Sequence, residues 1–236
     1  MSPARPGALE LRAARVRYGP LEALHGVSIA APAPGLTVLL GRNGSGRTTA
    51  LRALAGAVPL SGGAVVWDGT DVTRLAAHER ARRGLCFVPD RQAVFAGLTV
   101  RENLDLAHTG GDAAPALAAY PELRPLLARR AGTLSGGEQR MLALSRALLS
   151  RARVVLADEP TQGMSPAVAS RTYALLGDLD ACVVVAEQRP PPGLRGRAGL
   201  AALAYELRRG EVVFRGELAE LGRAPDGGVR PSPAPG

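Results

Sequence analysis

The chain has 236 residues and 46% apolar content, enough for one large α/β domain or for a core domain with an inserted subdomain. It contains no apolar run of about 18 residues and no apolar signal-peptide core at its start, which argues against a membrane-spanning helix and against export. The net charge of +8 comes from arginines spread along the whole chain, and only 3% of the residues are aromatic, so we expect no nucleic-acid partner.

The N-terminal part predicts an antiparallel β-layer, then a buried strand and a helix. Residues Leu9–Tyr18 and Leu24–Ala30 alternate apolar and polar side chains as edge strands do, with a turn at Gly19 and Pro20. The apolar run Leu36–Leu40 is typical of a strand buried on both faces of a parallel sheet. A Gly-rich loop and a predicted helix over 48–57 follow directly.

The middle of the chain predicts strands over 64–67 and 85–88, with a basic helix over 75–83 between them. From 99 to 131, leucine and alanine recur at helical spacing and are interrupted by glycines and prolines. We therefore expect a helical subdomain, at about residues 95–140, inserted into a domain that spans 8–222.

The last third alternates helices and strands. Predicted helices over 137–150 and 166–176 each precede a short apolar strand, at 154–157 and 182–186, which favours a mostly parallel sheet. A hairpin over 204–214 would turn at Arg209 and Gly210. The Pro- and Gly-rich tail over 223–236 is expected to be disordered.

The cysteines and histidines predict neither a disulfide nor a metal site. Cys86 and Cys182 lie far apart inside apolar runs, which indicates two buried thiols in a reducing compartment such as the cytoplasm. None of His25, His78 and His108 has a ligand-like spacing.

The loop after the Leu36–Leu40 strand has the composition of a phosphate-binding loop. Its glycines free backbone N–H groups for phosphate oxygens, a cation would contact the β- and γ-phosphates of a nucleotide, and a hydroxyl would hold Mg²⁺. Arg47 would be the cation and Thr48 the metal ligand. The candidate ATP-binding residues here are Gly41, Arg42, Asn43, Gly44, Ser45, Gly46, Arg47, Thr48 and Thr49.

Arg47 departs from the phosphate-loop pattern, which has lysine at this position. Lysine is a compact point charge, whereas guanidinium is planar and longer, so Arg47 could hold phosphates while misplacing the reacting one. All 29 basic residues are arginine, so genomic drift would also explain the change. Such drift would still leave the longer, planar guanidinium beside the phosphates. We expect impaired hydrolysis at this loop.

Two carboxylates follow the predicted strand over 154–157. Asp158 and Glu159 stand at its C-terminal end, where α/β sheets place their ligands. Asp158 would hold the Mg²⁺ shell, and Glu159 would polarise the attacking water. The alternative, a solvated acidic turn before Pro160, is disfavoured because the preceding strand is apolar.

The segment Leu134–Gln139, with the sequence LSGGEQ, is called here the signature segment. Its serine and two glycines would open a helix N-terminus toward an anion. Together with the upstream phosphate loop and the downstream acidic pair, it resembles the ATP-binding subunit of an ABC transporter over about residues 8–221. The resemblance implies an α/β P-loop NTPase core with a mostly parallel sheet, an antiparallel β-subdomain and the inserted helical subdomain.

The resemblance assigns roles to several of these residues. Asp158 would be the metal-binding aspartate and Glu159 the general base. Residues Ser135, Gly136, Gly137 and Glu138 would complete the nucleotide site of a facing subunit, which implies a dimer with a second ATPase or with itself. The segment Thr161–Pro166 matches a dimer-contact loop, although Gln162 and Met164 stand where leucines are common. Tyr18 would stack on adenine, with a turn-capping role as its alternative.

Two switch positions are similar to those of the branched-chain amino acid importer ATPases. Asp90 follows Val-Pro where many members have glutamine, and it joins the candidate metal shell. Gln188 follows the last core strand where many have histidine, and we take it as a candidate catalytic residue. After it, three successive prolines over 190–192 replace the usual continuation into a helix. We therefore expect impaired coupling between the γ-phosphate and the motion of the domain.

The resemblance implies an ATP- and Mg²⁺-dependent subunit that powers an importer of branched-chain amino acids or related solutes from the inner face of the cell membrane. Its partners would be a second ATPase and transmembrane permease subunits, with a solute-binding protein acting indirectly. The alternative is a regulatory nucleotide-binding module with little hydrolysis. A DNA-repair ATPase would need long coiled-coil arms, but the sequence has no sustained heptads. A kinase or GTPase would not explain the signature segment.

Overall fold

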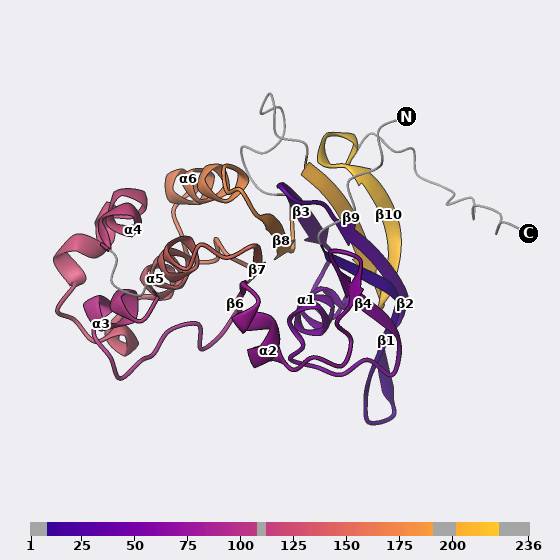
Figure 1. The fold of residues 1–236 in the computed structure, drawn as a ribbon. Helices are drawn as coiled ribbons and strands as arrows, with labels where there is room; N and C mark the ends of the chain where they lie inside the picture. The colour runs from indigo at the N-terminus through magenta and orange to yellow at the C-terminus, as the bar shows by residue number, and fades with distance from the viewer. Residues whose placement is uncertain (1–8, 108–111, 191–201, 222–236) are drawn as a thin grey trace, which may run out of the picture.

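The computed structural model describes residues 9–107, 112–190 and 202–221, and every statement on structure below refers to these ranges (Figure 1). The predicted disordered tail over 223–236, the prolines Pro191 and Pro192, and His108 lie outside them.

A six-stranded sheet forms the centre of the fold. Its order is β10 (Glu211–Glu217), β9 (Ala202–Arg208), β3 (Gly35–Leu40), β8 (Cys182–Glu187), β7 (Val154–Asp158) and β6 (Leu85–Val88). All neighbours are parallel except β9 and β10, which form the predicted hairpin, so the mostly parallel α/β sheet is confirmed. Because parallel strands end at one edge, the segments that follow β3, β7 and β8 meet there.

The second sheet is antiparallel and has four strands. Its order is β2 (Leu21–Ala31), β1 (Leu9–Tyr18), β4 (Gly62–Trp67) and β5 (Thr70–Asp71). The interpretation of β1 as an edge strand was wrong, because β1 lies between β2 and β4. Its alternation comes from one buried and one solvated face instead: Leu9, Leu11, Ala14 and Val16 are buried, while the other residues between Leu9 and Val16 are more exposed.

Helix α1 (Arg47–Ala55) lies between the two sheets. Its Leu51 and Leu54 pack in one core with Val16 of the antiparallel sheet and Val184 of the parallel sheet. The helix starts after Gly46, whose φ of 105° is left-handed, and an added Cβ there would come 2.9 Å from Leu24 Cδ2. A residue with a side chain is therefore excluded at the start of the helix.

A buried arginine holds the other end of α1. Arg80 lies on α2 (Ala77–Arg82), and its guanidinium donates hydrogen bonds to the carbonyl oxygens of Ala53 at 2.9 Å and Leu54 at 2.7 Å. These carbonyls belong to the last turn of α1, where a positive charge is favourable. Packing and capping thus fix both ends of the helix that follows the Gly-rich loop.

The remaining helices lie on the far side of the parallel sheet from β1 and β4 (Figure 1). They are α3 (Val100–Asp105), α4 (Ala114–Ala119), α5 (Gly136–Leu149) and α6 (Pro166–Gly177), with short 3₁₀ turns at Pro121–Leu126, Ala131–Thr133 and Leu218–Glu220. In the described part of the chain, no helix combines the length and apolar character needed to cross a bilayer.

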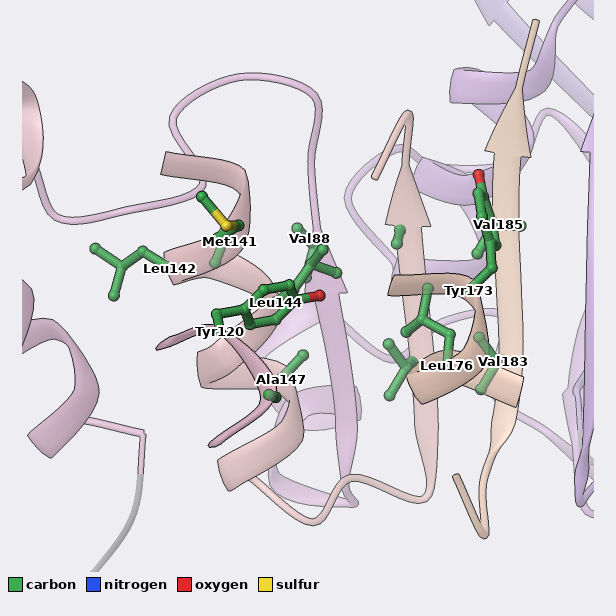
Figure 2. Close-up of a cluster of buried hydrophobic side chains, with 14 of the residues drawn as sticks. Val88, Tyr120, Met141, Leu142, Leu144, Ala147, Tyr173, Leu176, Val183 and Val185 are labelled. Carbon is green, nitrogen blue, oxygen red and sulfur yellow. The ribbon is translucent and has the colours of Figure 1, made fainter. Parts of the chain in front are cut away.

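A second core joins these helices to the sheet. Figure 2 shows the aromatic side chain of Tyr120 against Leu144 of α5, and that of Tyr173 on α6 beside Val185 of β8. The hydroxyl groups of Tyr120 and Thr172 are 3.0 Å apart and share a hydrogen bond, which links the segment before α5 to α6. The helices that surround the signature segment are therefore packed onto the strands that carry the candidate site.

Candidate functional site

An open cleft of about 790 Å³ lies at the carboxyl edge of the parallel sheet. The structure brings together in it most of the residues that the sequence singles out: Tyr18, residues 42–49 of the Gly-rich loop, Asp90, Asp158, Glu159 and Gln188. Gly41 is absent from this lining and borders a neighbouring cavity of about 590 Å³ on the other side of the loop. The segments after β3, β6, β7 and β8 are neighbours because these strands adjoin in the parallel sheet, while Tyr18 comes from β1 of the antiparallel sheet.

The Gly-rich loop packs closely against the segment that joins β9 and β10. An added Cβ at Gly41 would lie 2.4 Å from the carbonyl oxygen of Leu207 and 2.5 Å from Ser45 Oγ, so no side chain fits there. Gly210 N donates to the carbonyl oxygen of Ser45 at 2.9 Å. The first N–H groups of α1 have no acceptor within the helix, which makes this end of the cleft suitable for an anion.

Arg47 is bound to the candidate base. Its guanidinium is only 5% exposed, and Nη2 lies 3.3 Å from Glu159 Oε1. Gln188 Nε2 donates to the same oxygen at 2.9 Å. Glu159 has a left-handed φ of 47°, an uncommon conformation for a residue with a side chain, which turns its carboxylate away from the regular path of β7. The three side chains form one cluster at the floor of the cleft.

Several buried polar atoms of this cleft have no partner among the described residues. They are Arg47 Nη1, Ser45 Oγ and Asp158 Oδ2. A buried donor or acceptor without a partner lowers stability by about 1–3 kcal/mol, so such groups indicate a polar ligand. All three residues line the open cleft.

Asp158 has the surroundings of a metal ligand. It is 1% exposed and hydrogen-bonds the Thr48 side chain. Burial raises the pKa of Asp158; the Thr48 hydrogen bond lowers it, and the charge of Asp90 raises it further. The described residues contain no cluster of three or more His, Cys, Asp or Glu side chains that could hold a metal by itself. One carboxylate and one hydroxyl suit Mg²⁺, which keeps several waters and shares phosphate oxygens.

The signature residues lie elsewhere. Ser135 caps α5: its Oγ accepts from Glu138 N at 3.3 Å, and Glu138 Oε2 accepts from Ser135 N at 2.7 Å. Gly137 packs so closely on Gly163 that an added Cβ would lie 2.5 Å from its carbonyl oxygen. Among the described residues that line the main cleft, the signature positions 135–138 are missing, and Ser135 and Gly136 are exposed. The structure does not bring them to the phosphate loop of the same chain.

The remaining predicted positions are distributed as follows. Tyr18 ends β1 beside the cleft with 43% of its surface exposed. Asp90 lines the cleft and lies 3.9 Å from Arg91 Nε. Cys182 is buried, but Cys86 is only partly so, which corrects the interpretation of two fully buried thiols.

Sequence reasoning missed a partly buried acid, Glu187, beside the switch position. Glu187 ends β8, and its Oε1 accepts hydrogen bonds from the hydroxyls of Tyr173 and of Thr161, the latter at 3.2 Å. Burial raises the pKa of Glu187, while these two hydrogen bonds lower it. The available signal was an acidic residue that closes an otherwise apolar strand.

We expect Glu187→Gln to change how stability depends on pH. Because the pKa of Glu187 is higher in the folded than in the unfolded chain, its contribution is full at low pH and is lost as pH rises through the folded pKa. The free energy of unfolding of the variant, relative to wild type and measured by urea unfolding, should therefore rise as the pH is raised above the ordinary glutamate pKa of 4.5. Glu211→Gln, at an exposed position, should leave the difference flat. A constant difference for Glu187→Gln would contradict the raised pKa.

Comparison with known proteins identifies the relatives of this chain. The model of the ABC transporter family matches residues 24–162. The probable branched-chain amino acid transport ATP-binding protein LivF of Archaeoglobus fulgidus is 38% identical over 197 residues, which are 79% of this chain and 82% of that protein. The high-affinity branched-chain amino acid transport ATP-binding protein BraG of Pseudomonas aeruginosa is 33% identical, covering 86% of this chain and 90% of that protein.

Solved structures show the same fold. A dimeric bacterial ABC transporter cassette matches with a TM-score of 0.77 and 23% identity, over 89% of this chain and 98% of that one. A nucleotide-free ATP-binding cassette from an ABC transporter matches with a TM-score of 0.75 and 23% identity, over 89% and 91%.

Proposed function

The chain belongs to the ABC transporter family as an ATP-binding ATPase subunit, and from this premise we propose that it powers the import of branched-chain amino acids or related solutes. The solute class is inferred from the names of the two relatives above. The regulatory alternative is not favoured, since the chain matches these two transport ATP-binding proteins over most of their length.

We infer ATP as the ligand chiefly from the buried, unpartnered polar atoms at the floor of the cleft. Backbone N–H groups at the start of α1 would contact the phosphates, Arg47 Nη1 would donate to a phosphate oxygen, and Tyr18 would support the adenine. Thr48 and Asp158 would hold Mg²⁺, with Asp90 in its outer shell, and the ion would neutralise charge that develops on the phosphates.

We infer that Glu159 acts as the general base. In hydrolysis a water oxygen bonds to the γ-phosphorus, the bond from that phosphorus to the bridging oxygen breaks, and ADP leaves with the electron pair. Glu159 would accept the proton of the water, and Gln188 would orient the carboxylate through the 2.9 Å hydrogen bond.

The ion pair between Arg47 and Glu159 opposes the role of Glu159 as the base. While Arg47 Nη2 and Gln188 Nε2 both donate to Glu159 Oε1, that oxygen is occupied. A γ-phosphate would compete with Glu159 for the guanidinium and release the base. This competition is our explanation for the slow turnover that we expect at the chain's own site.

The signature segment supports a dimer, with a second ATPase or a second copy of this chain. Its residues are separate from the phosphate loop of their own chain, and Ser135 and Gly136 are exposed, so this end of α5 is accessible to a nucleotide held by a partner. We place the dimer on the inner face of the cell membrane against transmembrane permease subunits, with a solute-binding protein acting on the permease.

The test is reconstitution of the chain with its second ATPase and transmembrane partners in proteoliposomes. Radiolabelled leucine should accumulate on the ATPase side only when MgATP is present there, and the uptake should stop on chelation of Mg²⁺. ATP binding without association with any membrane subunit would contradict the transport function and support the regulatory alternative. ATP-dependent movement of a different solute would contradict only the amino-acid assignment.

A further inference from the structure

Arg140 on α5 is a buried arginine that contacts the catalytic edge from behind. It is 6% exposed, and its Nη1 donates to the carbonyl oxygen of Asp158 and to that of Pro89, each at 3.0 Å. Its Nη2 donates to Gln162 Oε1 at 3.2 Å. One guanidinium therefore holds two segments, the stretch after β6 and the end of β7 with the turn that follows it.

The three acceptors belong to functional segments of the cleft. Asp158 is the candidate metal ligand and precedes Glu159, while Pro89 precedes Asp90. Gln162 lies in the turn after β7 and lines the cleft. Arg140 itself stands three residues after Gly137, in the first turns of the helix that the signature segment opens.

Among the described residues, the hydrogen-bond partners of Arg140 are carbonyl and amide oxygens, and it forms no salt bridge with a carboxylate there. A buried charge held without a carboxylate is costly, and neutral side chains would avoid that cost. The planar fork of arginine is suited to reach several fixed acceptors at once, whereas lysine has one compact ammonium. These facts indicate that Arg140 serves to position its three acceptors rather than to stabilise the fold.

We propose that Arg140 is a positioning residue that couples the signature helix to the chain's own metal ligand and base. When the signature segment docks on a partner's nucleotide, movement of α5 would be transmitted through the guanidinium to Asp158, Pro89 and Gln162. The coupling rests on the proposed ATP-dependent dimer. It would make each site sensitive to the occupancy of the other.

The test compares Arg140→Met and Arg140→Lys with Arg146→Met. Arg146 is a matched control because it lies on the same helix and donates to a carbonyl oxygen, that of Ala93 at 3.1 Å, outside the catalytic edge. Arg140→Met should lower kcat for ATP hydrolysis about tenfold, equivalent to about 1.4 kcal/mol, with the Kd for ATP within about twofold of wild type. The Hill coefficient for ATP should fall toward one, and Arg140→Lys should recover only part of kcat.

A second readout does not depend on hydrolysis. ATP binding should slow amide hydrogen exchange at the start of α5 in the wild type and in Arg146→Met, but not in Arg140→Met. Equal protection in all three proteins would overturn the coupling. It would also be overturned if kcat falls in proportion to the loss of unfolding free energy, in the same way for Arg140→Met and Arg146→Met. A wild type that does not bind ATP would instead contradict the proposed function itself.

Discussion

Glu159→Gln should lower kcat for ATP hydrolysis by about 10²–10³-fold, because the variant removes the only carboxylate that the described site places against both Arg47 and Gln188. The Kd for ATP should stay equal or fall a few-fold. This second effect follows from the ion pair: glutamine does not hold the guanidinium as a charge, so Arg47 becomes free for the phosphates.

The measurement is steady-state hydrolysis and equilibrium ATP binding by the purified chain, alone and with its partner ATPase. Glu211→Gln, an exposed carboxylate on β10, is the control and should keep kcat within about twofold of wild type. An unchanged kcat in Glu159→Gln would show that another group accepts the proton, and weaker ATP binding would contradict the competition between Glu159 and phosphate for Arg47.

Arg47→Lys should raise kcat about tenfold while the Kd for ATP changes by less than about threefold. In the structure the planar guanidinium reaches Glu159 Oε1 with one nitrogen and leaves the other buried without a partner. A lysine is shorter and has a single ammonium group, so it would release the base more readily and approach the γ-phosphate as a point charge.

The matched control for this change is Arg52→Lys, at an exposed position on the same helix, which should leave kcat and Kd unchanged. If Arg47→Lys lowers kcat instead, guanidinium is an adapted substitute at this position and the site of the wild type is a conventional motor. The double variant of Arg47→Lys with Glu159→Gln should return to the low kcat of Glu159→Gln alone, because the gain acts through the base.

The sequence by itself determined the elements whose signals are local. The apolar run before Gly41, the glycines of the loop and the acidic pair after β7 each depend on a few adjacent residues, and buried parallel strands require such runs. The order of these motifs also indicated the family, which the family match over residues 24–162 confirms. The roles of the individual site residues remain predictions.

Only the tertiary structure decided which side chains face one another. Arg47 meets Glu159, 112 positions away, and Arg140 meets Pro89, 51 positions away, because the strand order β3, β8, β7, β6 brings their segments to one edge. The periodicity of the sequence contains no signal for contacts between residues so far apart in the chain. β1 was misplaced at an edge for a related reason: alternation reports one solvated face, while a strand's place in its sheet depends on partners that are distant in sequence.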